Sequence, residues 1–313
     1  MADRSRGRGG TLRLVCAVLF CLLPCTTQAR GAEAAGASLE RAWQEYGFQA
    51  FGNARKLFVE AGEAADADAE QRLQARLGLA FITHFQMPGR DPQAAIPLYE
   101  SLLDEAPDEP GWKVLLLARL GDCHAEIGPP QLTEARRFYR RALEAAPDTS
   151  LMVQETILRL LTTYLREPDP EVYARGLAAA GEFAGQMRGA HFESIYYGLQ
   201  SELAFFGGDM ARMAEALAAQ YRTGINNVKV KEKVLFQLAR VYEVELRDFV
   251  QAEHYYRKLA SEVPSSIKAH FALLRADELR AGKIQSDYAP ALAPLGQGPP
   301  ADDASGEEGG HGR

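Results

Sequence analysis

The feature that most constrains this chain is a pattern that returns about every 40 residues. An alanine is followed by an aromatic residue four positions later and by a proline twelve positions later. The three clear copies are Ala95, Tyr99 and Pro107; Ala135, Tyr139 and Pro147; and Ala252, Tyr256 and Pro264. The first two prolines are 40 residues apart, and the third lies 117 residues further on, close to three more periods. A fixed period of this length indicates stacked copies of one supersecondary unit.

The sequence around these positions favours helix throughout. From Leu39 to Gly282, Ala, Leu, Arg, Glu and Gln dominate, apolar residues recur at spacings of three and four, and no stretch alternates long enough to predict a strand. Proline cannot continue a helix, so each proline ends a unit. The segments Asp148-Thr149-Ser150 and Ser265-Ser266 offer N-caps for the helices that follow. We therefore predict an all-α fold of about six helix pairs and one closing helix, at residues 39–66, 71–106, 111–146, 150–188, 191–223, 229–262 and 266–282.

A small residue after a leucine precedes each alanine helix, as in Leu77-Gly78, Leu120-Gly121 and Leu238-Ala239. With the later Ala-x-x-x-aromatic and Pro, this pattern resembles the tetratricopeptide repeat, although the units here are nearer 40 residues than 34. The resemblance implies a right-handed superhelical solenoid that binds ligands on its concave face. It also implies packing roles for ten residues: Ala95, Tyr99, Pro107, Gly121, Ala135, Tyr139, Pro147, Ala252, Tyr256 and Pro264.

The N-terminal residues have the pattern of a targeting segment. Residues 1–13 carry four arginines and one acid, and they precede an apolar run of about ten residues, too short to cross a bilayer as a helix. We predict a signal peptide over residues 1–29, cleaved after Ala29 or Ala34. An uncleaved anchor and a lipid on Cys25 are the alternatives. The absence of an Asn-x-Ser/Thr sequon favours a bacterial route, which predicts a periplasmic protein or, alternatively, an outer-membrane-associated one.

Domain organisation follows from these boundaries. The helical solenoid is predicted for residues 39–282, and residues 286–313, rich in Pro, Gly and acids, are predicted to be a disordered tail. Of the four cysteines, only Cys123 lies outside the predicted signal, so the mature chain can form no internal disulfide and no cysteine-based metal site.

Motifs that would indicate an enzyme do not occur in the predicted mature chain. It contains no His-Glu-x-x-His, Gly-x-Ser-x-Gly or phosphate-binding glycine loop, and the six histidines are scattered. Cys123 and His124 are adjacent, so they point about 100° apart on a helix and do not face each other. We therefore predict no catalytic residues, no metal and no cofactor. The net charge of −7 also disfavours nucleic acid as a partner.

Three arginines occupy equivalent positions on successive first helices. Arg76 and Arg119 lie two residues before Gly78 and Gly121, and Arg159 follows in the fourth pair if Leu161 takes the place of the glycine. Guanidinium groups along one groove would suit carboxylates or an acidic segment, whereas the alternative is an ordinary solvated helix face. The sequence thus predicts an exported, non-enzymatic scaffold that binds a protein or a peptide, with no small-molecule substrate evident. The alternative is a subunit of an outer-membrane assembly, attached to the membrane only through its signal or a lipid on Cys25.

Overall fold

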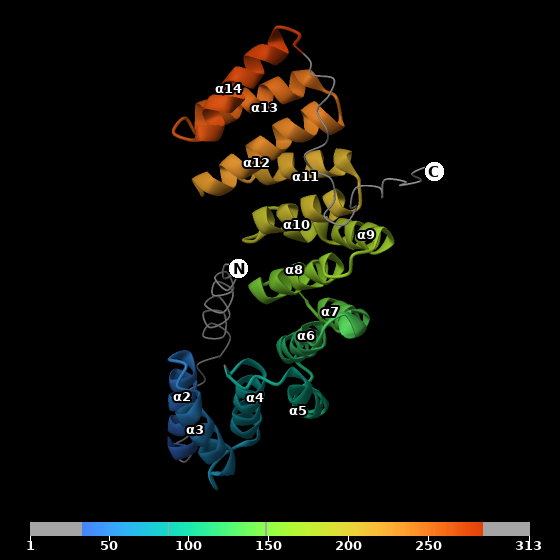
Figure 1. The fold of residues 1–313 in the computed structure, drawn as a ribbon. Coiled ribbons are helices and arrows are strands. Elements are labelled where there is room, and N and C mark those ends of the chain that lie inside the picture. The colour runs from blue at the N-terminus through green and yellow to red at the C-terminus, as the bar shows by residue number, and fades with distance from the viewer. Residues whose placement is uncertain (1–32, 87, 148, 284–313) are drawn as a thin grey trace, which may run out of the picture. The chain divides into compact units, whose positions relative to one another are not determined.

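The computed structural model describes residues 33–86, 88–147 and 149–283. The signal peptide predicted for residues 1–29, Cys25 and the tail predicted for residues 286–313 lie outside these residues. Every regular element in the described part of the chain is a helix (Figure 1). These residues fall into two compact units, one made of residues 33–167 and 183–192, the other of residues 168–182 and 193–283.

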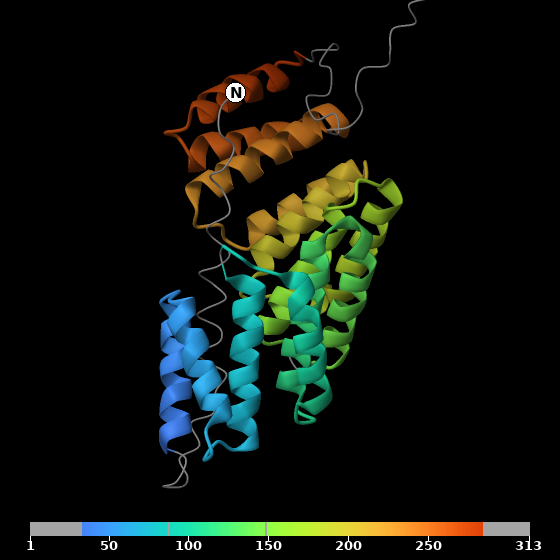
Figure 2. The same cartoon turned by 60° about the horizontal axis from the view of Figure 1, so that its bottom comes forward.

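The first unit contains three antiparallel helix pairs and one further helix. They are α2 (Glu33–Gly47), α3 (Phe51–Glu63), α4 (Ala69–Phe85), α5 (Pro92–Glu105), α6 (Pro110–Ile127), the short 3₁₀ helix η1 (Pro129–Gln131), α7 (Leu132–Glu144) and α8 (Leu151–Leu165). Each helix packs on the next one along the chain, as the neighbouring α2, α3 and α4 show in Figure 2. The first helices of successive pairs also touch, α2 on α4 and α6 on α8.

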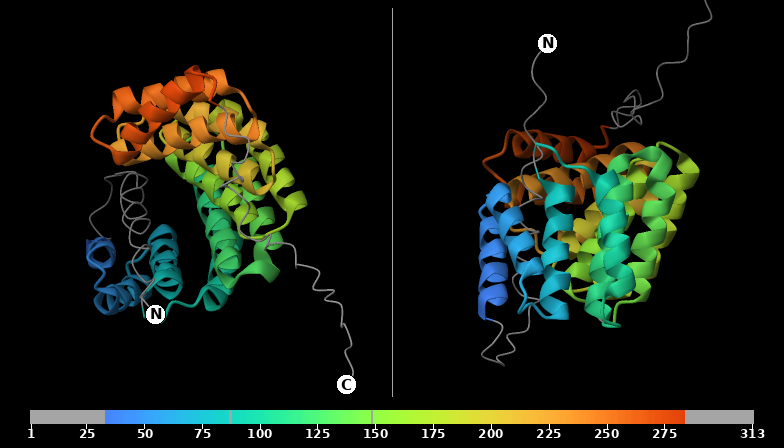
Figure 3. Two further views of the ribbon diagram at one scale, coloured as in Figure 1. Left: turned by 45° about the horizontal axis from the view of Figure 1, so that its top comes forward. Right: turned by 90° about the horizontal axis from the view of Figure 1, so that it is seen from below.

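The second unit continues the same order of elements. It holds most of α9 (Pro170–Met187), followed by α10 (Glu193–Phe206), α11 (Met210–Arg222), α12 (Val228–Arg240), the π-helical turn η2 (Val241–Glu245), α13 (Phe249–Glu262) and α14 (Ile267–Arg280). Within this unit α10 packs on α11, α12 on α13 and α13 on α14. Helices α12, α13 and α14 form the orange-to-red layer in Figure 3.

Local signals start and stop these helices. Ser150 accepts a hydrogen bond from the Val153 amide, and Ser266 accepts one from the Lys268 amide, so both serines are N-caps as predicted. The three prolines of the repeat pattern lie two or three residues beyond the ends of α5, α7 and α13, where they are exposed: Pro107, Pro147 and Pro264.

Close packing of an aromatic ring on a glycine joins helices of the first unit. A Cβ added to Gly121 of α6 would lie 2.6 Å from two ring carbons of Tyr139 in α7, which belongs to the same pair. A Cβ added to Gly78 of α4 would lie 2.3 Å from the Phe58 ring in α3, which belongs to the preceding pair. Only glycine allows these contacts, because carbon atoms normally pack about 3.5 to 4.0 Å apart.

The predicted fold class is confirmed: the described chain is all-α and consists of helix hairpins followed by a closing helix. In the second, third and fourth pairs, the two helices are joined by residues 86–91, 128–131 and 166–169. Between residues 33 and 283, no helix is both long and apolar enough to cross a membrane.

Candidate functional site

The three arginines predicted to bind a ligand all have carboxylate partners within the chain. Arg76 of α4 pairs with Glu105 of α5 and donates to the Ser101 hydroxyl at 2.8 Å. Its side chain is 40% exposed, and the hydrogen bond to Glu105 raises the pKa of the guanidinium. Arg76 is therefore reachable from solvent, but any ligand there must compete with Glu105.

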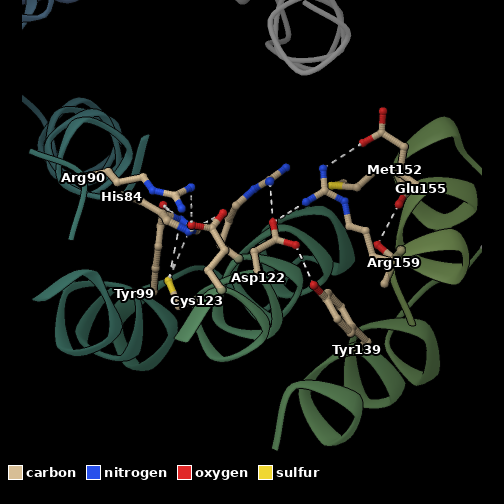
Figure 4. A network of polar contacts seen from close by, with 12 residues as sticks. His84, Arg90, Tyr99, Asp122, Cys123, Tyr139, Met152, Glu155 and Arg159 are labelled. Atoms are coloured by element: carbon tan, nitrogen blue, oxygen red, sulfur yellow. Dashed lines mark hydrogen bonds and ion pairs between the residues drawn. The ribbon is translucent and has the colours of Figure 1, made fainter. Parts of the chain in front are cut away.

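Arg119 and Arg159 share the carboxylate of Asp122. Oδ2 of Asp122 lies 2.6 Å from Nη1 of Arg119 and 2.5 Å from Nη1 of Arg159, while Oδ1 accepts a hydrogen bond from the Tyr139 hydroxyl at 2.7 Å (Figure 4). Arg159 also lies 3.6 Å from Glu155, one turn earlier on α8. Asp122 thereby joins its own helix α6 to the second helix of its pair and to the first helix of the next pair.

Burial and charge together set the protonation of this cluster. Burial by itself would raise the pKa of Asp122, but the nearby guanidinium groups of Arg159 and Arg119 outweigh it and hold that pKa below its usual range. Burial opposes the charge on Arg159, but Asp122 prevails and raises the pKa of its guanidinium. Asp122 and Arg159 are consequently both charged at neutral pH.

The predicted arginine row differs in accessibility along its length. The Arg119 side chain is only 6% exposed, and its guanidinium lies 5.7 Å from the ring centres of Phe81 and Phe85. The Arg159 side chain is 28% exposed. The structure thus places Arg76 and Arg159 at the surface formed by the first helices, whereas Arg119 lies beneath it.

A second set of polar side chains surrounds His84 of α4. The His84 ring is 3.3 Å from the Tyr99 hydroxyl and 3.7 Å from Glu126, which also pairs with Arg90 at 3.0 Å. Burial lowers the pKa of His84 to about 4, and burial raises the pKa of Glu126. His84 is therefore neutral near pH 7.

The Cys123 thiol contacts this histidine rather than its sequence neighbour. Its Sγ lies 3.6 Å from both ring nitrogens of His84, whereas His124 stacks on Phe138 with ring centres 5.2 Å apart. Burial raises the pKa of the Cys123 thiol. Because the thiol stays protonated beside a neutral imidazole, the pair lacks the thiolate that a cysteine nucleophile needs.

An equivalent cluster in the second unit was missed by sequence reasoning. Glu243, in the π-helical turn η2, accepts a hydrogen bond from the Tyr256 hydroxyl at 2.7 Å and lies 2.7 Å from Arg275 of α14. Arg240, three residues earlier, lies 3.9 Å from the same carboxylate. A sequence signal that could have predicted this cluster is an acid three residues after an arginine on a first helix, together with the tyrosine of the repeat pattern.

The residues predicted to pack the repeats lie as follows. Six alanine and tyrosine positions have exposed fractions of 2% or less: Ala95, Tyr99, Ala135, Tyr139, Ala252 and Tyr256. Gly121 is also buried, against the Tyr139 ring. Among the described side chains, no group of three or more His, Cys, Asp or Glu residues could hold a metal ion.

Together, stacked helix pairs, small-residue contacts and ion clusters between first helices define a helical-repeat protein. Residues 233–266, from α12 to the N-cap of α14, match the family model described as tetratricopeptide repeat. This match covers one repeat of the chain, in its second unit.

Other comparisons give more distant similarity. No curated protein matches this sequence. A solved structure titled "Functional Characterization of Pseudomonas Aeruginosa pilF" is similar, with 18% sequence identity and a TM-score of 0.48, over 77% of this chain and 98% of that chain.

Proposed function

We propose that this protein is a non-enzymatic scaffold that binds a protein or a peptide through the first-helix face of its first unit, formed by α4, α6 and α8. The observation that carries the proposal is the pair of partly exposed guanidinium groups, Arg76 and Arg159, at equivalent positions of that face. Both already pair with carboxylates of the chain, so the geometry suits an incoming carboxylate that replaces Glu105 or Glu155.

The proposed setting is the bacterial cell envelope. The arginine-rich start and short apolar run of residues 1–29 support export to the periplasm. The second candidate is a subunit of an outer-membrane assembly, because Cys25 lies two residues after the end of the apolar run and is a candidate for a lipid. The intact mass of protein recovered from its native host separates the two, since a lipid would add its mass at Cys25.

The binding face is tested by affinity capture with matched variants. The bait is the full chain, expressed with its own signal, and stoichiometric partners are identified by mass spectrometry. We expect Arg76→Gln combined with Arg159→Gln to reduce recovery of the partner at least several-fold. The control is Arg137→Gln on the second helix α7, whose side chain is 68% exposed.

The outcome against the proposal is equally specific. If the double variant keeps its circular dichroism spectrum and recovers as much partner as the control, the two arginines do not form the binding face. A urea unfolding curve for each variant distinguishes lost binding from lost folding.

A further inference from the structure

The closing helix α14 exposes an apolar stripe. Ile267, Phe271 and Leu274 are spaced by four and three residues, so they lie on one side of the helix, and their exposed fractions are 91%, 41% and 54%. The opposite side of α14 carries Ala272 and Ala276, which are fully buried in the core of the second unit. We call Ile267, Phe271 and Leu274 the α14 stripe.

The stripe is continuous with the core of its unit. The Phe271 ring lies 6.1 Å from that of Phe236 in α12 and 6.3 Å from that of Tyr256 in α13, centre to centre. Terminal elements of repeat proteins need a polar outer side, because no further repeat covers them. An apolar outer side on α14 therefore indicates a surface that another segment covers.

We propose that residues 284–295 of the same chain bind the α14 stripe. This segment follows α14 directly and carries four large apolar side chains, Ile284, Tyr288, Leu292 and Leu295. Three exposed apolar residues on the helix thus have apolar residues to cover them within the next twelve positions of the chain.

The end of α14 sends the chain in the required direction. Gly282 has φ +72°, its amide donates to the Leu279 carbonyl at 3.0 Å, and the Lys283 amide donates to the Glu278 carbonyl at 2.9 Å. These two hydrogen bonds and the left-handed glycine form a Schellman motif, which turns the chain away from the helix direction. The residues after Lys283 therefore start at the C-terminal end of α14, on the side of the stripe where Leu274 lies.

The segment is also long enough. Ile267 lies 16 residues before Lys283, which corresponds to about 24 Å along a helix. An extended chain advances about 3.3 Å per residue, so about eight residues after Lys283 reach the far end of the stripe. Pro290 and Pro294 fit an extended segment better than a helix.

Charge supports the same path. The N-terminal halves of α12 and α14 carry four lysines: Lys229, Lys231, Lys233 and Lys268. Lys268 and Glu232, 2.9 Å apart, join these two helix ends, and Glu262 pairs with Lys231. A chain that runs back along α14 would lead its later residues towards these lysines. After the uncharged residues 296–301, these include four acids: Asp302, Asp303, Glu307 and Glu308.

Photo-crosslinking from the stripe tests the proposal in the full chain. Leu274 is replaced by the photoreactive amino acid p-benzoylphenylalanine, and crosslinked peptides are identified by mass spectrometry in an equal mixture of ¹⁵N-labelled and unlabelled protein. We expect crosslinks to residues 284–295 within one isotopic form. The control is the same replacement at Val250 of α13, an apolar residue that is 76% exposed outside the stripe and should not reach that segment.

Each other outcome would overturn the proposal. Crosslinks that join the two isotopic forms would assign the stripe to a second copy of the chain, and crosslinks to a co-purified protein would assign it to a partner. Crosslinks to no peptide would leave the stripe uncovered. As a second measurement, Tyr288→Asp combined with Leu292→Asp should reduce the crosslink yield several-fold, whereas Gln297→Asp should leave it unchanged.

Discussion

Replacing Gly121 by alanine tests the packing on which the repeat frame depends. The new Cβ would lie 2.6 Å from Cδ1 and Cε1 of Tyr139, about 1 Å closer than carbon atoms normally approach. The tyrosine ring cannot move away freely, because its hydroxyl donates to Asp122 at 2.7 Å in a buried site. A displacement of about 1 Å would break that hydrogen bond.

The expected cost follows from three contributions to the free energy of unfolding. Overpacking costs about 1 to 3 kcal/mol, and the lost hydrogen bond to a charged acceptor costs about 1.5 to 3 kcal/mol. Alanine in place of glycine within a helix stabilises by about 1 kcal/mol. We expect Gly121→Ala to lower the free energy of unfolding by about 1.5 to 5 kcal/mol.

Urea unfolding followed by far-UV circular dichroism measures this change. Gly111→Ala is the matched control on the same helix, because its Cβ would meet no atom within 4 Å, and it should be neutral or stabilising by up to about 1 kcal/mol. In a Tyr139→Phe background, Gly121→Ala should cost less, since no hydrogen bond remains to be broken. The reasoning is refuted if Gly121→Ala unfolds at the same urea concentration as Gly111→Ala.

Three further predictions concern the buried polar groups. Asp122→Ala leaves Arg119 and Arg159 without their shared carboxylate, so it should lower the free energy of unfolding in urea by about 3 to 5 kcal/mol. The control Asp108→Ala removes a side chain that is 89% exposed and should change stability by less than about 0.5 kcal/mol; equal effects of the two variants would contradict a structural role for Asp122. The pKa of His84 falls from 6.5 in the unfolded state to about 4 in the folded state, so between these pH values only the unfolded state binds the proton. The free energy of unfolding should therefore be highest above about pH 6.5 and decrease towards pH 4. The decrease should be weaker in His84→Phe. Cys123 is buried and its thiol pKa is raised, so peptide mapping should find it alkylated only in urea, and rapid alkylation of the folded chain would show that the pocket opens.

The steric part of the fold was predictable from sequence because it is encoded locally. A small residue, an alanine and an aromatic ring at fixed spacings determine how closely two helices approach, and proline determines where they end. Where this spacing occurs, the helix pairs follow from it. In α10 and α11, which carry little of the family pattern, the helices were predictable only from their composition and the spacing of their apolar residues.

The partners of the arginines were not predictable in the same way. Arg76, Arg119 and Arg159 share one register, yet their carboxylates come from different positions: Glu105 lies at the end of a second helix, and Asp122 lies beside the frame glycine. Long side chains reach partners in neighbouring helices, and their direction depends on the packing of those helices. Register alone predicts which helix face a residue occupies, but not which charge it meets or how deeply it is buried.

The two ion clusters show that two repeats can form the same interaction between a carboxylate, a tyrosine and two arginines although the carboxylate stands at different positions of the repeat. Asp122 and Glu243 each bind the frame tyrosine of their own pair, an arginine three residues earlier and an arginine of the next first helix. Asp122 follows the small frame residue by one position, whereas Glu243 follows Ala239 by four, nearly one helical turn later. The carboxylate is thus defined by the site between a tyrosine and the next first helix, not by its position in the repeat, and a search for this interaction in similar chains should test geometry before register.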